Sequence, residues 1–412
     1  MLRRCFFLPA RRFRVVVALL AVMVSTASAQ PKFKILHAFS GSDGAGLWGN
    51  LIVDQKGNLY GTTGGGGPYK YGTVFELSPG SGGEWTHTIL HGFDIHGDGG
   101  YAPLGGLVFD AQGNLYGGAE EGGAHDAGTI FELTPGSSGW TYTVIYTFCS
   151  KSKCQDGGAP YGALAIDKAG ILYGTAGGAF ELTSGSDGWT EEVLYGFRSN
   201  RGGTTALAGP ILDEAGNLYG TTEKGGTTCP PPGCGTTYEL KPVGEGWKHI
   251  ILHNFGSFQY DGEGASVGQL AVDGAGSLYG TTFAGGRNIC FTGCGTVFKL
   301  TPESNGHWKE TILYNFRNGA SGNGPGGGVV VDKAGNLYGT TIYGGGQCGC
   351  GVVYKLAPAA KGGWKYTVLH TFVGSDGAQP DANLILDSQG NLYGTTPAGG
   401  SGGLGVVFEV TP

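Results

Sequence analysis

One short segment recurs seven times along this chain, and its period constrains the fold more than any other feature of the sequence. The segment reads Gly-Asn-Leu-Tyr-Gly-Thr-Thr at residues 57–63, and six near copies follow it. Self-similarity at intervals of 46 to 60 residues is typical of arrays built from one repeated supersecondary unit. The tyrosines of the seven copies are Tyr60, Tyr116, Tyr173, Tyr219, Tyr279, Tyr338 and Tyr393.

Each unit contains four short segments that are typical of β-strands. The first is an apolar run that ends in aspartate, and the second is the Asn-Leu-Tyr-Gly segment. The third reads Gly-Thr-Val-Phe-Glu-Leu or similar, and the fourth opens with tryptophan, as in residues 85–93. Alternating apolar residues, aromatic and β-branched side chains and Gly, Asp or Pro boundaries favour strands, with Asp-x-x-Gly-Asn as a hairpin turn. Four antiparallel strands repeated seven times predict an all-β fold, a seven-bladed β-propeller with four-stranded blades.

The seventh unit lacks its fourth strand, because the chain stops soon after the third strand at residues 405–410. Residues 33–39, Phe-Lys-Ile-Leu-His-Ala-Phe, match the missing strand. We therefore expect this N-terminal strand to complete the last blade and close the ring, which removes two open sheet edges. The match aligns Leu36 with Leu90, His37 with His91 and Phe39 with Phe93.

The repeated Gly-Asn-Leu-Tyr-Gly-Thr-Thr, followed by Gly-Thr-Val-Phe-x-Leu, resembles the GloVer tandem repeat of secreted bacterial proteins. The resemblance covers essentially the whole chain after its first residues, and seven occurrences make it specific. It implies a secreted protein with propeller-like repeats, and it implies no established reaction. The Asp-x-x-Gly-Asn-Leu-Tyr turn is more weakly similar to NHL-type and virginiamycin-lyase-like propellers.

The first 29 residues have the pattern of a secretory signal peptide. Five arginines precede or open the apolar run at residues 15–24, and Ala27-Ser28-Ala29 forms an A-x-A cleavage signal. The apolar run is too short to span a membrane as a helix. We expect residues 1–29 to be removed and residues 30–412 to form a single β-propeller domain, secreted or periplasmic.

The charge balance excludes some partners. Without its first 29 residues the chain has 20 basic and 32 acidic residues, a formal net charge of −12. Such a surface argues against binding nucleic acid or anionic lipid through bulk charge. No later apolar run is long enough to span a bilayer, so we expect no membrane span after signal cleavage. We also expect a monomer without a cofactor.

Eight cysteines remain after the signal peptide, and they fall into four closely spaced pairs. An exported chain makes disulfides the expected state, and the absence of a matching histidine set disfavours zinc. An i to i+2 bridge is strained, so the last pair is left open. The pairs are Cys149/Cys154, Cys229/Cys234, Cys290/Cys294 and Cys348/Cys350.

Loop lengths distinguish the two faces of the predicted ring. The first-to-second and third-to-fourth connections are short, whereas the second-to-third connections and the links between blades are long and variable, as in residues 40–48, 64–71 and 223–234. We call the face that carries these long connections the long-loop face and the other the short-turn face. Variable loops on a rigid ring are the usual place for binding. The residues that depart from the repeat on this face are the predicted ligand-binding residues: Trp48, Asp98, Tyr101, Tyr161 and Tyr260.

Histidines and most repeated acids have a structural interpretation. Four histidines occupy a repeat position that holds tyrosine in other units, which indicates a space-filling ring: His37, His91, His253 and His370 against Tyr146, Tyr195 and Tyr314. Asp-Gly pairs recur in the links between blades, where carboxylates could collect cations or bind hydroxyls, although Asp-Gly is also ordinary turn chemistry. These aspartates are Asp43, Asp98, Asp156, Asp261 and Asp376.

The sequence thus favours a binding function over catalysis. A Gly-x-Ser-x-Gly match at residues 399–403 lies in a glycine-rich loop with no helix after it, so it does not indicate a hydrolase. No catalytic residue and no metal site are predicted. The leading hypothesis is a secreted binding or scaffold module that engages an extracellular ligand, a glycan or peptide, with its long-loop face; the partner would be an extracellular glycan or protein. The alternative is an extracellular lyase or glycoside hydrolase that uses carboxylates of the same face.

Overall fold

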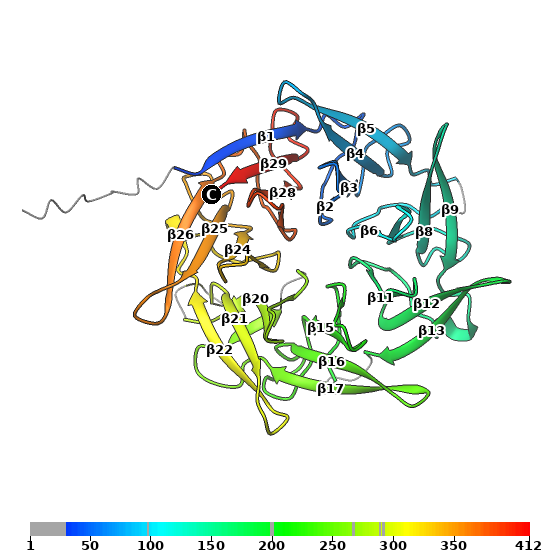
Figure 1. The fold of residues 1–412 in the computed structure, drawn as a ribbon. Coiled ribbons are helices and arrows are strands. Elements are labelled where there is room, and N and C mark those ends of the chain that lie inside the picture. The colour runs from blue at the N-terminus through cyan, green and yellow to red at the C-terminus, as the bar shows by residue number, and fades with distance from the viewer. Residues whose placement is uncertain (1–29, 97–98, 198–201, 266–267, 288–289, 291–292) are drawn as a thin grey trace, which may run out of the picture. The chain divides into compact units, whose positions relative to one another are not determined.

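The computed structural model describes residues 30–96, 99–197, 202–265, 268–287, 290 and 293–412. The predicted signal peptide, residues 1–29, lies outside the described residues. Residues 31–412 form seven antiparallel sheets arranged around one axis (Figure 1), which confirms the predicted seven-bladed propeller. Apart from strands, the described residues form two short 3-10 turns, η1 (Ser152–Cys154) and η2 (Gly319–Ser321).

The two inner strands of each blade come from the first half of each repeat. The innermost strands have two residues each and are β2 (Ile52–Val53), β6 (Val108–Phe109), β10 (Ala165–Ile166), β14 (Ile211–Leu212), β19 (Ala271–Val272), β23 (Val330–Val331) and β27 (Ile385–Leu386). The second strands are β3 (Leu59–Thr63), β7 (Leu115–Ala119), β11 (Leu172–Thr175), β15 (Leu218–Thr222), β20 (Leu278–Gly285), β24 (Leu337–Thr341) and β28 (Leu392–Thr396).

The two outer strands are longer. The third strands are β4 (Thr73–Pro79), β8 (Thr129–Gly136), β12 (Gly178–Gly185), β16 (Thr236–Val243), β21 (Thr296–Pro302), β25 (Val352–Pro358) and β29 (Val406–Thr411). The outermost strands are β5 (Trp85–Gly92), β9 (Gly139–Thr147), β13 (Gly188–Gly196), β17 (Gly246–Asn254), β22 (Trp308–Asn315), β26 (Trp364–Thr371) and β1 (Lys32–Ala38). We number the blades 1 to 7 by their innermost strands, from β2 to β27.

The N-terminal strand closes the ring as predicted. β1 pairs antiparallel with β29, with Phe33 opposite Val410 and Ala38 opposite Val406. The sheet order of blade 7 is therefore β1-β29-β28-β27, which joins the start of the described chain to its end (Figure 1). Blade 5 departs from the common plan in one respect, because an extra strand, β18 (Gly262–Ala265), pairs with the extended end of β20.

The Asp-x-x-Gly-Asn-Leu-Tyr sequence is explained by one hydrogen-bonded turn that all seven blades share. In blade 1, Oδ1 of Asp54 accepts from the backbone N–H groups of Lys56 and Asn58, at 2.8 and 2.9 Å. Its Oδ2 accepts from the Asn58 amide at 2.9 Å and from the Tyr60 hydroxyl at 3.3 Å. The aspartate thus satisfies the turn's donors and holds the tyrosine ring in place.

The core is built between blades. Five of the seven repeat tyrosines meet the tryptophan of the next blade edge-to-face, as Tyr60 does with Trp140 at 6.2 Å between ring centroids. Inside a blade, a phenylalanine or tyrosine of the third strand lies over the glycine of Leu-Tyr-Gly. A Cβ added at Gly61 would come within 2.7 Å of Phe75, so only glycine fits there.

Polar side chains from distant blades meet on the axis. The Asn50 amide donates to the Gln269 side-chain oxygen at 3.3 Å, and the Asn383 backbone N–H donates to Asn50 Oδ1 at 2.7 Å. The Asn383 amide in turn donates to the Gln269 carbonyl at 3.2 Å. Blades 1, 5 and 7 are therefore linked directly across the centre of the ring.

Candidate functional site

The long connections gather on one face. In five blades an isolated β-bridge joins the preceding link between blades to the second-to-third connection, as Ala45 does with Gly65 and Asn323 with Tyr343. In blade 5 this contact grows into the β18–β20 pair. The long-loop face is thus a continuous layer of loops held to one another by backbone hydrogen bonds, a rigid support for side chains.

Variable residues line the axial opening of this face. One position of each innermost segment differs from blade to blade. Counted as the sixth residue before the turn aspartate, it holds tryptophan, leucine, tyrosine, glycine or aspartate among the described residues, whereas the next residue is always glycine or alanine. These variable residues are Trp48, Leu104, Tyr161, Leu207, Gly326 and Asp381.

Trp48, Tyr161 and Asp381 line the same axial opening, a narrow space of about 30 Å³. The Trp48 side chain is 41% exposed. Burial raises the pKa of the Tyr161 hydroxyl to about 12, and the nearby carboxylates of Asp381 and Glu120 add to this effect. Two of the predicted ligand-binding aromatics are therefore brought together, and an aspartate that was not predicted lies with them.

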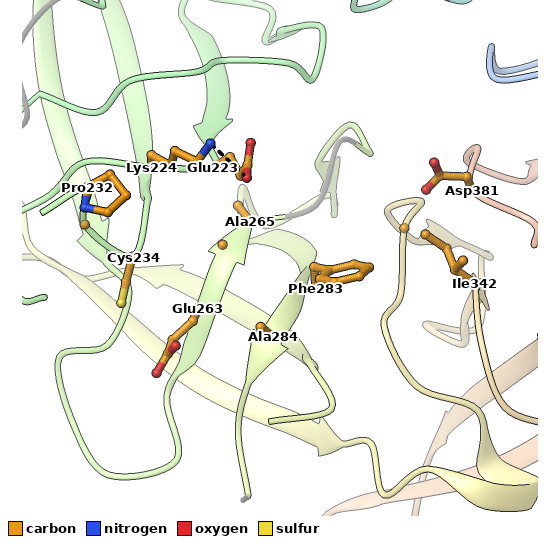
Figure 2. A pocket seen from close by; sticks show the side chains of 13 residues that line it. Glu223, Lys224, Pro232, Cys234, Glu263, Ala265, Phe283, Ala284, Ile342 and Asp381 are labelled. Carbon is orange, nitrogen blue, oxygen red and sulfur yellow. Dashed lines mark ion pairs between the residues drawn. The ribbon is translucent and has the colours of Figure 1, made fainter. Parts of the chain in front are cut away.

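A larger cleft extends from this opening over blades 4 to 7 and has a volume of about 530 Å³. In Figure 2, Lys224 and Pro232 line one side, Asp381 and Ile342 the other, and Phe283 lies between them. Lys224 pairs with Glu223 at 3.6 Å. The cleft combines an exposed aromatic ring and apolar walls with a few charged groups, which is the usual composition of a ligand site.

Asp381 is the most perturbed group of the cleft. Burial raises the pKa of its carboxyl to about 6. Its Oδ1 is buried and has no hydrogen-bond partner among the described residues. Gly326 makes room for it, because a Cβ at that position would lie 1.8 Å from Oδ1. The carboxyl is thus held against the wall of the cleft with hydrogen-bonding capacity to spare.

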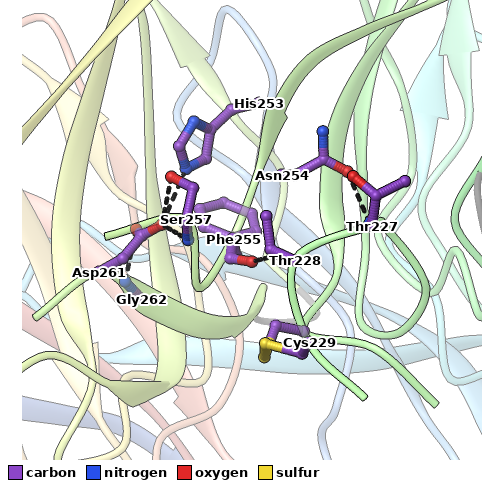
Figure 3. Close-up of a disulfide and its surroundings, with 10 residues drawn as sticks. Thr227, Thr228, Cys229, His253, Asn254, Phe255, Ser257, Asp261 and Gly262 are labelled. Carbon is purple, nitrogen blue, oxygen red and sulfur yellow. Dashed lines mark hydrogen bonds and ion pairs between the residues drawn. A yellow bond between two sulfur atoms is a disulfide. The ribbon is translucent and has the colours of Figure 1, made fainter. Parts of the chain in front are cut away.

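Four disulfides stiffen the long-loop face, including the pair left open by the sequence. One of them, Cys229–Cys234, forms part of the cleft wall through Cys234 and lies beside the blade 4–5 link (Figure 3). The Thr228 hydroxyl donates to the Phe255 carbonyl next to it. The bridges are Cys149–Cys154, Cys229–Cys234, Cys290–Cys294 and Cys348–Cys350.

The remaining predicted ligand-binding residues lie away from the axial opening. The Tyr101 ring meets Tyr71 edge-to-face at 5.5 Å, and a hydrogen bond with Glu121 raises the pKa of its hydroxyl to about 12. Tyr260 is 45% exposed in the blade 4–5 link, where the Arg287 guanidinium lies over its ring at 5.9 Å. Asp98 lies outside the described residues.

The histidine position is a contact between blades, as its sequence variation predicted. At five junctions its ring stacks on a ring from the outermost strand of the next blade, with centroids 3.6–4.5 Å apart. At the other two junctions the partner is a glutamate. The stacked pairs are His37–His87, His91–Tyr142, Tyr195–His249, Tyr314–Tyr366 and His370–Phe33.

Four of the five Asp-Gly aspartates are used inside the links, which favours their interpretation as turn residues. Asp43 and Asp376 accept from His37 and His370 at 2.8 and 2.9 Å. Each also accepts a backbone N–H of its own link, as Asp376 does from Val373 at 2.8 Å. The fifth, Asp98, is not among the described residues.

Phe283, Glu263 and Asp381 were not singled out from the sequence. Asp381 shares its repeat position with Trp48 and Tyr161, so an alignment of all seven units at that position would have revealed it. Phe283 follows the Thr-Thr pair of blade 5, a position held by glycine, glutamate, isoleucine or proline elsewhere. The second-to-third connection of blade 3 is shorter than in the other blades, and a hollow of about 170 Å³ lies beside Gly177.

Comparison with known proteins agrees with the architecture. A family model described as Gloeobacter/Verrucomicrobia repeat matches residues 21–185 and 290–412. No curated protein matches the chain. No helix among the described residues is long and apolar enough to cross a membrane.

Solved structures with a similar fold include PorZ, an essential bacterial surface component of the type-IX secretion system of Porphyromonas gingivalis. It has a TM-score of 0.55 at 16% identity, over 90% of this chain and 47% of PorZ, so the chain spans less than half of that protein. A putative glucose dehydrogenase from Thermus thermophilus has a TM-score of 0.44 at 14% identity, over 92% and 100% of the two chains. A luciferin-regenerating enzyme has a TM-score of 0.44 at 16% identity, over 74% and 90%. At 16% identity the likeness to PorZ shows the fold alone.

Proposed function

Because this chain belongs to the Gloeobacter/Verrucomicrobia repeat family, and its variable residues gather on one face of a closed ring, we propose that it is a secreted binding module. The cleft of its long-loop face engages an extracellular glycan or peptide. The disulfides fit an extracellular or periplasmic location, where such bonds form and persist.

The observation that carries this proposal is the cleft of about 530 Å³ between Phe283 and Asp381. Phe283 is 42% exposed and offers a face on which a sugar ring or a side chain can stack. The Asp381 carboxyl lines the cleft and can accept a hydroxyl or amide N–H, and Glu223 and Lys224 add charge at the far side. One aromatic platform with a few fixed polar groups favours a polar ligand that has apolar patches.

The rigidity of the loops supports binding as well. Because the links and the second-to-third connections are bridged to each other and stapled by disulfides, little conformational entropy is lost when a ligand docks. The short-turn face offers seven nearly identical hairpins instead, and identical turns give a ligand little to distinguish one blade from another.

The proposal is tested by screening the protein against arrays of soluble oligosaccharides and of peptides, followed by titration calorimetry on any hit. Phe283→Ala and Asp381→Asn are expected to weaken binding by roughly ten- to hundredfold each, as for central anchor residues. Gln389→Ala, an exposed change in a turn of the short-turn face, is the matched control and leaves the affinity unchanged. Affinity that survives both cleft changes and falls in the control would assign the ligand to the opposite face.

A lyase or glycoside hydrolase is the second candidate, and Asp381 is the observation that favours it. A carboxyl with a pKa of about 6 is partly protonated near neutral pH and can serve as a general acid. Glu263 lines the same cleft and supplies a second carboxylate. Turnover of a polysaccharide hit, measured as new reducing ends and abolished in Asp381→Asn, would favour the enzyme. Binding of a polysaccharide without turnover would support the binding module instead.

A further inference from the structure

Three ionisable side chains meet inside the junction of blades 4 and 5, away from the cleft. Nε2 of His253 lies 3.2 Å from Asp261 Oδ2 and 3.2 Å from Glu310 Oε2. The side chains of Asp261 and Glu310 are 0% and 2% exposed, and that of His253 is 11% exposed. Figure 3 shows His253 and Asp261 on either side of Ser257. One imidazole therefore faces two carboxyl groups that are shielded from water.

Glu310 is unusual for its repeat position. The second residue after the tryptophan of the outermost strand, with Phe33 as its counterpart in β1, is an aromatic ring that stacks on the preceding blade at five of the seven junctions. Only Glu191 and Glu310 replace the ring with a carboxyl among these seven positions. The chain thus contains two junctions with a buried carboxyl at the same position, and the two can be compared for the cation that pairs with the carboxyl.

Glu191, at the junction of blades 2 and 3, has a cation of its own. Lys151 Nζ forms an ion pair with it, and the Lys151 backbone belongs to the link that Asp156 organises. In that link Ser150 N–H donates to Asp156 Oδ2 at 2.9 Å, just as Ser257 N–H donates to Asp261 Oδ2 at 2.8 Å.

Because Ser150 and Ser257 make the same hydrogen bond, the residues that follow them occupy the same position in the two links. This position holds Lys151 in the blade 2–3 link and Phe258 in the blade 4–5 link. Phe258 is 48% exposed and meets His253 edge-to-face at 6.5 Å, so it brings no charge to Glu310. No lysine or arginine among the described residues forms an ion pair with Glu310. The blade 4–5 junction has the buried carboxyl of the blade 2–3 junction without its cation.

The oxygens of Glu310 also lack compensating partners. Both are buried, and beyond the contacts with His253 and Asp261 neither has a hydrogen-bond partner among the described residues. The single Nε2 of His253 is already engaged with Asp261. A carboxylate in this position needs either a proton or a cation to be stable.

We propose that the blade 4–5 junction is a divalent-cation site in which His253 Nε2, Asp261 Oδ2 and Glu310 Oε2 bind Zn²⁺ or a similar first-row metal ion. One imidazole and two carboxylates form a donor set suited to such ions. Ligands at the usual Zn–N and Zn–O distances are about 3.3 Å apart in a tetrahedral site, close to the two 3.2 Å separations given above.

Second contacts already hold the proposed ligands in place. Gly262 N–H donates to Asp261 Oδ1 at 2.7 Å, and the Ser257 hydroxyl and N–H donate to Oδ2 at 3.1 and 2.8 Å. Such outer contacts orient ligating carboxylates. The His253 ring also meets Phe255 edge-to-face at 5.1 Å, which limits its rotation.

The test uses the exported protein, free of any affinity tag and stripped with EDTA. Equilibrium dialysis against Zn²⁺ with mass-spectrometric metal analysis is expected to give about one Zn²⁺ per chain, and saturating Zn²⁺ raises the unfolding temperature. Glu310→Gln and His253→Gln lower the affinity by roughly tenfold or more. Glu191→Gln is the matched control at the junction with its own lysine and leaves Zn²⁺ binding unchanged.

Phe258→Lys keeps the test decisive if a ligand variant fails to fold. The new lysine occupies the position that Lys151 has beside Glu191, so it is expected to form an ion pair with Glu310 in place of the metal ion. The variant should remain folded, lose Zn²⁺ binding and lose the Zn²⁺-dependent rise in unfolding temperature. A wild-type protein that binds no Zn²⁺ would overturn the proposal and leave Glu310 protonated. Zn²⁺ binding that persists unchanged in Glu310→Gln or in Phe258→Lys would overturn it equally.

Discussion

The ring of Phe33 stacks on the ring of His370, with centroids 3.6 Å apart and planes 7° apart. Phe33 belongs to β1, the first strand, and His370 to β26 of blade 6, so the contact forms the junction between blades 6 and 7. The same type of contact recurs around the ring, but here it depends on a segment that is separated in sequence by more than 300 residues. Closure therefore depends on side-chain packing between blades as well as on the β1–β29 ladder.

Removal of this strand should destabilise the whole ring. Deletion of residues 33–39 takes the outer strand from blade 7 and is expected to lower the unfolding temperature by many degrees. Phe33→Ala removes only the stack of a half-buried ring and should cost about 1–3 kcal/mol of unfolding free energy. Denaturant unfolding measures both, with exposed Lys32→Ala as control. A deletion that melts within a degree or two of the intact domain would exclude closure by this strand.

The repeated turn aspartate should be a stability residue in every blade. In blade 6, Asp332 accepts from the N–H groups of Ala334 and Asn336, both at 2.9 Å, and from the Tyr338 hydroxyl at 3.0 Å. Asp332→Ala leaves these donors unsatisfied and should cost about 1–3 kcal/mol in denaturant unfolding. Lys333→Ala changes an exposed neighbour in the same turn and should be nearly neutral. Equal effects of the two changes would contradict the role given to the carboxylate.

The four cysteine pairs should be oxidised in protein taken from its native compartment. Non-reducing peptide mapping is expected to recover Cys149–Cys154, Cys229–Cys234 and Cys290–Cys294 as local bridges, together with the Cys348–Cys350 pair. Free thiols at the first six positions would exclude the proposed stiffening of the long-loop face.

Asp381 should make stability depend on pH in a direction opposite to that of most carboxyl groups. Its pKa rises from an ordinary value of 3.8 to about 6 on folding, because burial penalises the ionised form. The stability that it contributes is fully present below the unfolded pKa and is lost as the pH rises through 6. Relative to Asp381→Asn, the wild type should lose up to about 3 kcal/mol between pH 4 and pH 7. If the unfolding free energies of the wild type and of Asp381→Asn changed in parallel with pH, the Asp381 carboxyl would be solvated and the prediction would be wrong.

Trp48 and Tyr101 should differ in their importance for binding. Trp48 is exposed in the axial opening beside Tyr161, whereas the Tyr101 ring is occupied by Tyr71 and its hydroxyl by Glu121. Trp48→Ala is expected to weaken any cleft ligand by roughly ten- to hundredfold, and Tyr101→Ala by less. Calorimetry with an array hit separates them. A larger loss in Tyr101→Ala would move the binding centre from the axis to the outer links.

The fold could be predicted from the sequence because its determinants are local and repeated. The turn around Asp54, the strand pattern and the split seventh unit each follow from short segments, and their agreement specifies a closed ring. The site could not be predicted in the same way. Phe283 and Asp381 are about one hundred residues apart, and only the curvature of the ring places them in one cleft. The amide contacts of Asn50 with Gln269 likewise join blades that no local pattern relates.

Those axial amide contacts also bear on how a molecule bound in the proposed cleft would leave. Asn50, Gln269 and Asn383 bond to one another across the centre of the ring, so among the described residues blades 1, 5 and 7 are joined at the axis next to the cleft wall. On the proposed function, a molecule held beside Asp381 is expected to depart through the long-loop face by which it arrived. Its residence time would then be governed by the loops at that entrance.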